Sequence, residues 1–180
     1  MSLNNRILIA SPCYGSVEPE VTEDWVRFAY HCGRRMPQYD FYFGLKGKSE
    51  QFRARNMIVE GAQQHNCDRI LMLDDDMIID WQDKGKESFD FLRKLIAHDK
   101  HICGVLYYQR GGECEPVLMK AINDGNAYRM LHDDEVTHSL QQVDVAGGGC
   151  LLIQTRIFDR IPFPYFAPEH KWGTDIQLCE

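Results

Sequence analysis

The sequence lacks the signals of several protein classes. No apolar run approaches the roughly 18 residues that a membrane-spanning helix needs, and no apolar signal segment follows the first residues. The seven cysteines include no Cys-x-x-Cys pair and their number is odd, so we expect neither a disulfide framework nor a zinc ribbon. We therefore expect a cytoplasmic protein with no transmembrane segment.

Positive charge is also scarce, and it is unevenly placed. The formal net charge is −7. Residues 1–66 carry 8 Lys or Arg and 7 Asp or Glu, whereas residues 67–180 carry 12 and 20. Nucleic-acid binding requires a basic face, so we expect no nucleic-acid partner. A focused acidic cluster would suit a divalent cation, although from charge alone a solvated acidic surface is the simpler interpretation.

What is present is a pattern of alternating strands and helices. The 180 residues are 44% hydrophobic and 26% charged, which suits one globular domain and excludes global disorder. The apolar spacing predicts strands at 6–10, 39–45, 68–73 and 101–107, separated by helices at about 20–36, 49–65 and 89–96. This alternation predicts an α/β fold whose central sheet is mostly parallel, with helices on both faces.

The second part of the chain has a different pattern. Residues 108–146 contain Gly111-Gly112 and Asp124-Gly125 between short strand-like runs, which predicts a small antiparallel insertion. A strand at 150–153 and a short helix at 155–160 follow, and a further helix is expected from Thr174 onward. We expect a single domain over 1–180, divided at residue 107 into two functional halves.

The sharpest chemical feature is the acidic triplet, residues 74–76 (Asp-Asp-Asp), directly after an apolar strand. Ligands of open α/β sheets bind at the carboxyl ends of strands. Two carboxylates one residue apart, Asp74 and Asp76, can both face a Mg²⁺ or Mn²⁺ ion, which often shares oxygen ligands with substrate phosphates. The alternative is an acidic turn or helix cap, which the mutual repulsion of three adjacent carboxylates disfavours.

Three weaker features accompany the triplet. Arg55 and Asn56 lie in the first turns of a predicted helix, where guanidinium groups and the helix field suit phosphate, although ordinary surface arginines are the simpler alternative. The glycine run, residues 147–149, permits close backbone approach, yet it also fits a simple loop and is no P-loop. Asp175 follows Thr174 at a predicted helix start, where it could cap the helix or act as a general base.

Together these stretches resemble the GT-A glycosyltransferases, the family 2-like nucleotide-diphospho-sugar transferases. The likeness covers nearly the whole chain and depends on the order of the motifs more than on any one of them. The segments that carry it are Ile7 to Pro12, Ala54-Arg55-Asn56, Leu73 to Asp76, Gly147 to Ile153 and Gly173 to Ile176.

The resemblance implies a transferase that uses a UDP- or GDP-linked sugar with Mn²⁺ or Mg²⁺ and a saccharide, lipid or protein acceptor. Residues 1–107 would form the nucleotide-sugar-binding half, and 108–180 the insertion and acceptor half. Asp74 and Asp76 would match the D-x-D metal motif, and Asp175 the catalytic base. The remaining implied contacts are donor binding by Ser11, Pro12, Cys13, Tyr14, Arg55, Asn56, Asp74 and Asp75, and acceptor binding by Asp144, Gly147, Gly148 and Gly149.

The sequence departs from the family in two places. Thr174 precedes Asp175 where members often have Glu, and the chain ends at Glu180 before the further metal ligand, commonly His, that many members carry. We therefore expect a chain that is C-terminally truncated relative to the family. Two alternatives stay open: a catalytically inactive nucleotide-sugar or carbohydrate-binding module, and, less favoured because Ser11 to Gly15 has no lysine, a metal-dependent nucleotidyltransferase.

Overall fold

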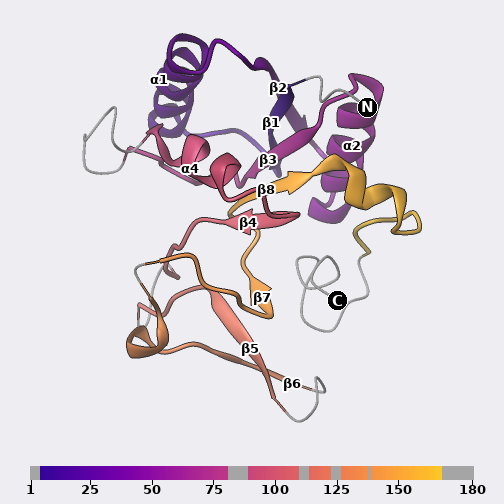
Figure 1. Cartoon of the computed structure of the whole chain (residues 1–180). Helices are drawn as coiled ribbons and strands as arrows, with labels where there is room; N and C mark the ends of the chain where they lie inside the picture. Colours follow the sequence, from indigo (N-terminus) through magenta and orange to yellow (C-terminus); the bar gives the residue numbers. More distant parts are fainter. Residues whose placement is uncertain (1–4, 81–88, 110–113, 123–126, 138, 168–180) are drawn as a thin grey trace.

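The computed structural model describes residues 5–80, 89–109, 114–122, 127–137 and 139–167 (Figure 1). A five-stranded sheet crosses the molecule in the order β2-β1-β3-β8-β4. Strands β1, β2 and β3 are parallel, and β8 is antiparallel to both β3 and β4. The strands are β1 (Arg6–Cys13), β2 (Asp40–Gly47), β3 (Arg69–Leu73), β4 (Ile102–Gly104) and β8 (Cys150–Gln154).

Helices cover both faces of this sheet, as the alternating pattern predicted. α1 (Pro19–Arg35) and α4 (Phe91–Ala97) lie on one face, and α2 (Gln51–Gln64) and the 3-10 helix η2 (Thr155–Asp159) lie on the other (Figure 1). The fold class is therefore confirmed as mixed α/β with a mostly parallel central sheet. The helix predicted at 155–160 is present as the 3-10 helix η2.

Two cores follow from the alternation of side chains along the strands. Ile7 and Ile9 of β1 point to the α1 side and pack with Phe28 and Leu92. Leu8 and Ala10 point to the α2 side and pack in the cluster that contains Ile58, Ile70 and Phe158. Each face of the sheet is thus closed by its own helices, and the carboxyl edge is left for polar groups.

Strand β1 runs three residues further than the sequence indicated. The sequence predicted a strand that ends at Ala10, yet Pro12 still pairs in register with Lys46 of β2. The pairing of β1 with β3 stops at Ala10, so beyond that point β1 has a neighbour on one side only. A proline there removes no ladder hydrogen bond on the β3 side, which explains why the strand tolerates it.

Strand β8 has an orientation that the sequence did not indicate. Its residues pair antiparallel with β3, so that Leu73, at the end of β3, lies opposite Cys150, at the start of β8. The glycine run before β8 is therefore delivered to the carboxyl end of β3. A parallel β8 would have placed it at the opposite edge.

The expected antiparallel insertion is confirmed as a second, three-stranded sheet in the order β6-β5-β7. Its strands are β5 (Leu118–Ile122), β6 (Ala127–Met130) and β7 (Val145–Ala146), with the short 3-10 helix η1 (Asp133–Glu135) between β6 and β7. Ile122 pairs with Ala127, so β5 and β6 form a hairpin around the predicted Asp124-Gly125 turn, which itself lies outside the described residues. In Figure 1 this sheet lies beyond β4.

Two expectations from the sequence, on membrane-spanning helices and on cysteines, can be compared with this fold. None of the described helices is both long enough and apolar enough to cross a bilayer. Six described cysteines are free thiols, five of them buried. Burial raises the pKa of the Cys32 and Cys150 thiols to about 12, so they are inert core groups at neutral pH.

Candidate functional site

The acidic triplet begins where β3 ends, and the backbone fixes it to the glycine run. The Asp74 N–H donates to the Gly149 carbonyl oxygen at 3.0 Å, and the Met77 N–H donates to the Asp74 carbonyl oxygen at 3.1 Å. The chain thus turns immediately after β3 with its polar backbone groups satisfied. The carboxyl end of β3 and the start of β8 therefore form one hydrogen-bonded corner, in which Asp74 and Gly149 are neighbours.

Arg55 lies beneath this corner. It projects from α2 with 2% of its side chain exposed, and its Nη2 lies 3.3 Å from Oδ1 of Asp74, which is 27% exposed. Burial lowers the pKa of the Arg55 guanidinium, and burial is also the main cause that raises the pKa of Asp74, with Asp76 and Asp75 adding to the rise and Arg55 opposing it. The sequence suggested that Arg55 contacts a phosphate; in this structure its partner is Asp74.

Asn56 fixes a distant segment of chain against α2. Its Nδ2 donates to the Phe166 carbonyl oxygen at 2.7 Å, and its Oδ1 accepts from the Phe166 N–H at 3.2 Å. The Phe166 ring lies 5.8 Å from the Arg55 guanidinium carbon and closes the far side of that buried charge. Asn56 is buried, so its amide is a clamp on residue 166 in this structure.

The second carboxylate of the triplet holds the loop after β1. Oδ2 of Asp75 accepts from the Tyr14 N–H at 3.0 Å. The resemblance implied donor binding by Asp75; in this structure its carboxylate fixes the backbone at Tyr14. Of the four residues expected to border the donor in this loop, only Tyr14 is exposed, and the buried ones are Ser11, Pro12 and Cys13.

The third carboxylate, Asp76, is the most exposed of the three. The chain that follows it is held against α1. Trp25 donates its ring N–H to the Met77 carbonyl oxygen at 3.1 Å, and the buried Asp24 carboxylate accepts from the N–H groups of Ile79 at 2.6 Å and Asp80 at 3.2 Å. Both ends of the acidic triplet are therefore anchored, and Asp76 is presented outward from a fixed loop.

The glycine run is packed against Tyr107. The Gly149 N–H donates to the Tyr107 hydroxyl oxygen at 2.9 Å. A Cβ built on Gly147 would overlap the Tyr107 hydroxyl and would lie 2.5 Å from Cγ1 of Val117. Gly147 and Gly149 therefore allow the close approach of Tyr107, an approach that the sequence of the run permits.

We expect Gly147→Ala to lower the free energy of unfolding by about 1–3 kcal/mol, because an added methyl group in a filled space forces its neighbours to shift. The matched control is Gly61→Ala in α2, where nothing lies within 4 Å of the new Cβ. That change should raise stability by about 0.5–1 kcal/mol through helix propensity. Urea denaturation followed by circular dichroism measures both; equal effects at the two positions would contradict the packing argument.

Two predicted site residues are not brought to this corner by described contacts. Oδ2 of Asp144 accepts from the Ala121 N–H at 2.8 Å, so in this structure its carboxylate joins β5 to the segment before β7. Asp175, the expected base, lies outside the described residues together with Gly173, Thr174 and Ile176. Their roles stay predictions.

The described residues do not form a complete metal site by themselves. Across residues 5–167, as far as the structure describes them, no three His, Cys, Asp or Glu side chains are grouped so as to hold a metal ion. Asp74 and Asp76 offer two carboxylates, of which Asp74 is already bonded to Arg55. Two carboxylates suit a Mg²⁺ or Mn²⁺ that takes its other oxygens from phosphates and water. The two carboxylates therefore suit a cation that arrives with a diphosphate, and they are too few to hold a permanently bound cation.

Three residues of this corner were missed in the sequence. Asp24 lies within the predicted helix at 20–36, Tyr107 at the end of the predicted strand at 101–107, and Phe166 beyond the predicted helix at 155–160. Each acts through a tertiary contact with a residue at least 40 positions away. A polar Asp on the buried side of an otherwise apolar helix stripe was the one available signal.

No protein-family model matches this sequence, and no curated protein matches it. Among solved structures, the chain is similar to the one titled "Crystal Structure of A197 from STIV". The two share 15% sequence identity with a TM-score of 0.56, over 97% of this chain and 76% of that chain. At this identity the likeness shows a shared fold, which agrees with the mixed α/β architecture.

Proposed function

We propose that this protein is a metal-dependent glycosyltransferase with a GT-A fold, which moves a sugar from a nucleotide-diphospho-sugar to an acceptor hydroxyl. The observation that carries the proposal is the position of the acidic triplet. It follows β3 at the carboxyl edge, beside β1, where the strand order β2-β1-β3 makes successive crossovers run in opposite directions. Open α/β sheets bind ligands at such a point. The ordered motifs shared with GT-A enzymes suggest the class of ligand.

In this proposal the chain's own residues have distinct tasks. Asp76 and the exposed part of Asp74 share a Mn²⁺ or Mg²⁺ with the donor diphosphate. When bound, that cation offsets the negative charge that develops on the leaving diphosphate. Arg55 is a positioning residue, because its buried guanidinium holds the Asp74 carboxylate in one orientation. Tyr14, exposed on the loop that Asp75 fixes, offers an aromatic face to the base.

Binding and activation of the acceptor would involve residues outside the corner formed by Asp74 and Gly149. Asp175 is the candidate base that takes the proton of the acceptor hydroxyl. The glycine run, which the resemblance assigns to the acceptor, packs against Tyr107 next to Asp74, so an acceptor bound there would also meet the Tyr107 side chain. Retention or inversion at the anomeric carbon depends on where that base lies.

Calorimetric titration of the full chain with UDP, GDP and their sugar conjugates, with and without Mn²⁺ or Mg²⁺, tests the proposal. We expect one nucleotide series to bind only when the cation is present, and the cation alone not to bind, because the triplet supplies too few ligands. Binding that is independent of metal, or no binding of any nucleotide, would contradict it.

The second candidate is a nucleotide-sugar-binding module without turnover. The departure from the family pattern before Asp175 favours it, whereas the intact Asp74 and Asp76 disfavour it. A transfer assay with the nucleotide that binds, and with simple saccharide acceptors, separates the two. Released nucleoside diphosphate identifies a transferase or hydrolase, whereas binding without release identifies the module.

A further inference from the structure

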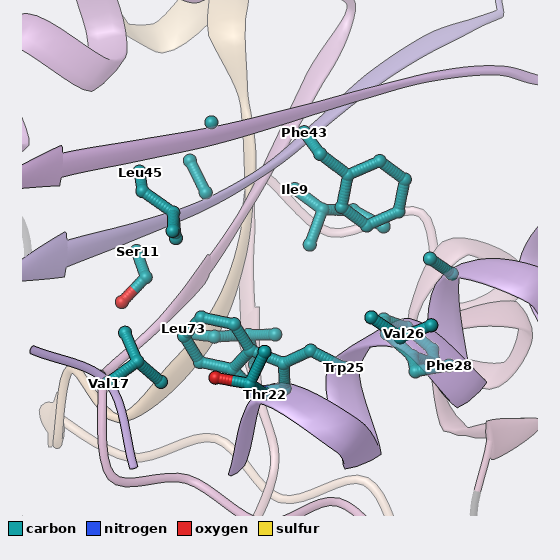
Figure 2. A pocket seen from close by; sticks show the side chains of 13 residues that line it. Ile9, Ser11, Val17, Thr22, Trp25, Val26, Phe28, Phe43, Leu45 and Leu73 are labelled. Atoms are coloured by element: carbon teal, nitrogen blue, oxygen red, sulfur yellow. The ribbon is translucent and has the colours of Figure 1, made fainter. Parts of the chain in front are cut away.

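The edge of the main sheet at β2 carries apolar side chains that nothing in the described chain covers. β2 is the last strand of the sheet, with β1 as its one neighbour among the described strands. Phe43 and Leu45 are 52% and 60% exposed. They line an apolar groove of about 310 Å³ whose opposite wall is α1, with Trp25 and Val26 facing them (Figure 2). Exposed apolar edge strands invite pairing with another chain.

The backbone of β2 shows which groups face the open edge. The Asp40 N–H donates to the Asn5 carbonyl oxygen, on the β1 side. Since N–H and C=O groups alternate sides along a strand, the even-numbered residues of β2 face β1. The odd-numbered residues Phe41, Phe43 and Leu45 therefore direct their N–H and C=O groups outward. These are also the residues whose side chains lie on the α1 face.

The sequence of β2 is complementary to itself in one antiparallel register. With a twofold axis at Phe43, the outward-facing groups pair as Phe43 with Phe43 and Phe41 with Leu45. The same register places Asp40 opposite Lys46 at both ends of the strand. These charged pairs fall at non-hydrogen-bonded positions, where opposing side chains are closest and opposite charges stabilise a sheet.

We propose that two copies of this chain pair through the β2 edge, antiparallel about Phe43, and form one continuous ten-stranded sheet. The twofold axis is perpendicular to the sheet, so the two α1 helices lie on the same face. The two apolar grooves then meet, and the half-exposed Phe43 and Leu45 of each copy pack against those of the other. Asp40, whose nearest partner is Arg6 at 3.8 Å, gains a cross-strand partner in Lys46.

A charge-reversal cycle tests the register. Sedimentation velocity should show the wild-type full chain as a concentration-dependent dimer. Lys46→Asp and Asp40→Lys each place like charges opposite one another twice, and each should raise the dimer dissociation constant by about tenfold or more. The double variant Asp40→Lys/Lys46→Asp restores opposite charges and should return that constant to within about twofold of wild type.

Two further variants complete the design. Lys94→Asp, the same charge change on the exposed surface of α4, should leave the dimer unchanged. Phe43→Lys places two ammonium groups at the twofold axis and should give a monomer with an unaltered circular dichroism spectrum. A monomeric wild type at the highest concentration, or a dimer that Lys46→Asp and Lys94→Asp affect equally, would overturn the proposal and leave the edge to a different partner.

Discussion

Replacing Arg55 by methionine should lower the free energy of unfolding by about 3 kcal/mol. The change removes the cation beside Asp74 and leaves a half-buried carboxylate with its desolvation cost uncompensated. Breaking a buried ion pair typically costs 3–5 kcal/mol, and the partial exposure of Asp74 places the effect toward the lower end. Urea denaturation followed by circular dichroism gives the value.

Arg53 is the matched control for this experiment. It lies two residues away on the same helix, is largely exposed and pairs with Glu50 on the surface. Arg53→Met should therefore change stability by no more than about 0.5 kcal/mol. The double variant Arg55→Met/Asp74→Asn, which removes both charges, should cost less than the sum of the single changes. Equal stabilities of the Arg53 and Arg55 variants would show that the ion pair carries no energy.

Substitutions of the three aspartates in the acidic triplet should have different effects on ligand binding. We expect Asp76→Asn and Asp74→Asn to weaken metal-dependent nucleotide binding by about 100-fold or more, equivalent to about 2.7 kcal/mol, because each removes one of only two carboxylates available to the cation. Asp75→Asn keeps a side-chain oxygen that can accept from the Tyr14 N–H, so its effect should stay within a few-fold. Calorimetric titration under the conditions used for the wild type measures all three.

The comparison depends on folded variants. Thermal unfolding of each one checks this before the titrations. Asp75→Ala, which removes the acceptor for Tyr14, should weaken binding more than Asp75→Asn does, because the loop after β1 then loses its tether. If Asp75→Asn were as damaging as Asp76→Asn, the middle carboxylate would be a ligand and the division of roles would be wrong.

The layered α/β fold could be predicted because its signals are local. Buried parallel strands give continuous apolar runs such as Ile70 to Leu73, and helices with one buried side, such as α1, give spacings of three and four. The direction of β8 could not be predicted, since an apolar run such as Cys150 to Ile153 reads the same for a strand running either way. That direction is what brings Gly149 to Asp74.

The candidate site was predicted in its members more than in its contacts. Asp74, Asp76 and the glycine run stand out by residue type alone. The burial of Arg55 depends on Phe166, which is 111 residues further along the chain and joined to α2 by Asn56. No spacing rule links such positions. For this reason the sequence did not indicate the internal ion pair of Arg55 with Asp74, and the phosphate contact of Arg55 stays a prediction.

The connection between β4 and β8 has a consequence for how this protein could diversify. The Val105 N–H donates to the Cys150 carbonyl oxygen, so the chain leaves the main sheet and rejoins it at neighbouring points. The strands β5, β6 and β7 of the small sheet lie in the chain between these two neighbouring points, Val105 and Cys150, which are close to the corner that Asp74 and Gly149 form. Lengthening, shortening or replacing that segment would leave the strand order of the main sheet intact. We therefore expect variation among relatives to concentrate between Val105 and Cys150, while the frame of the main sheet stays unchanged.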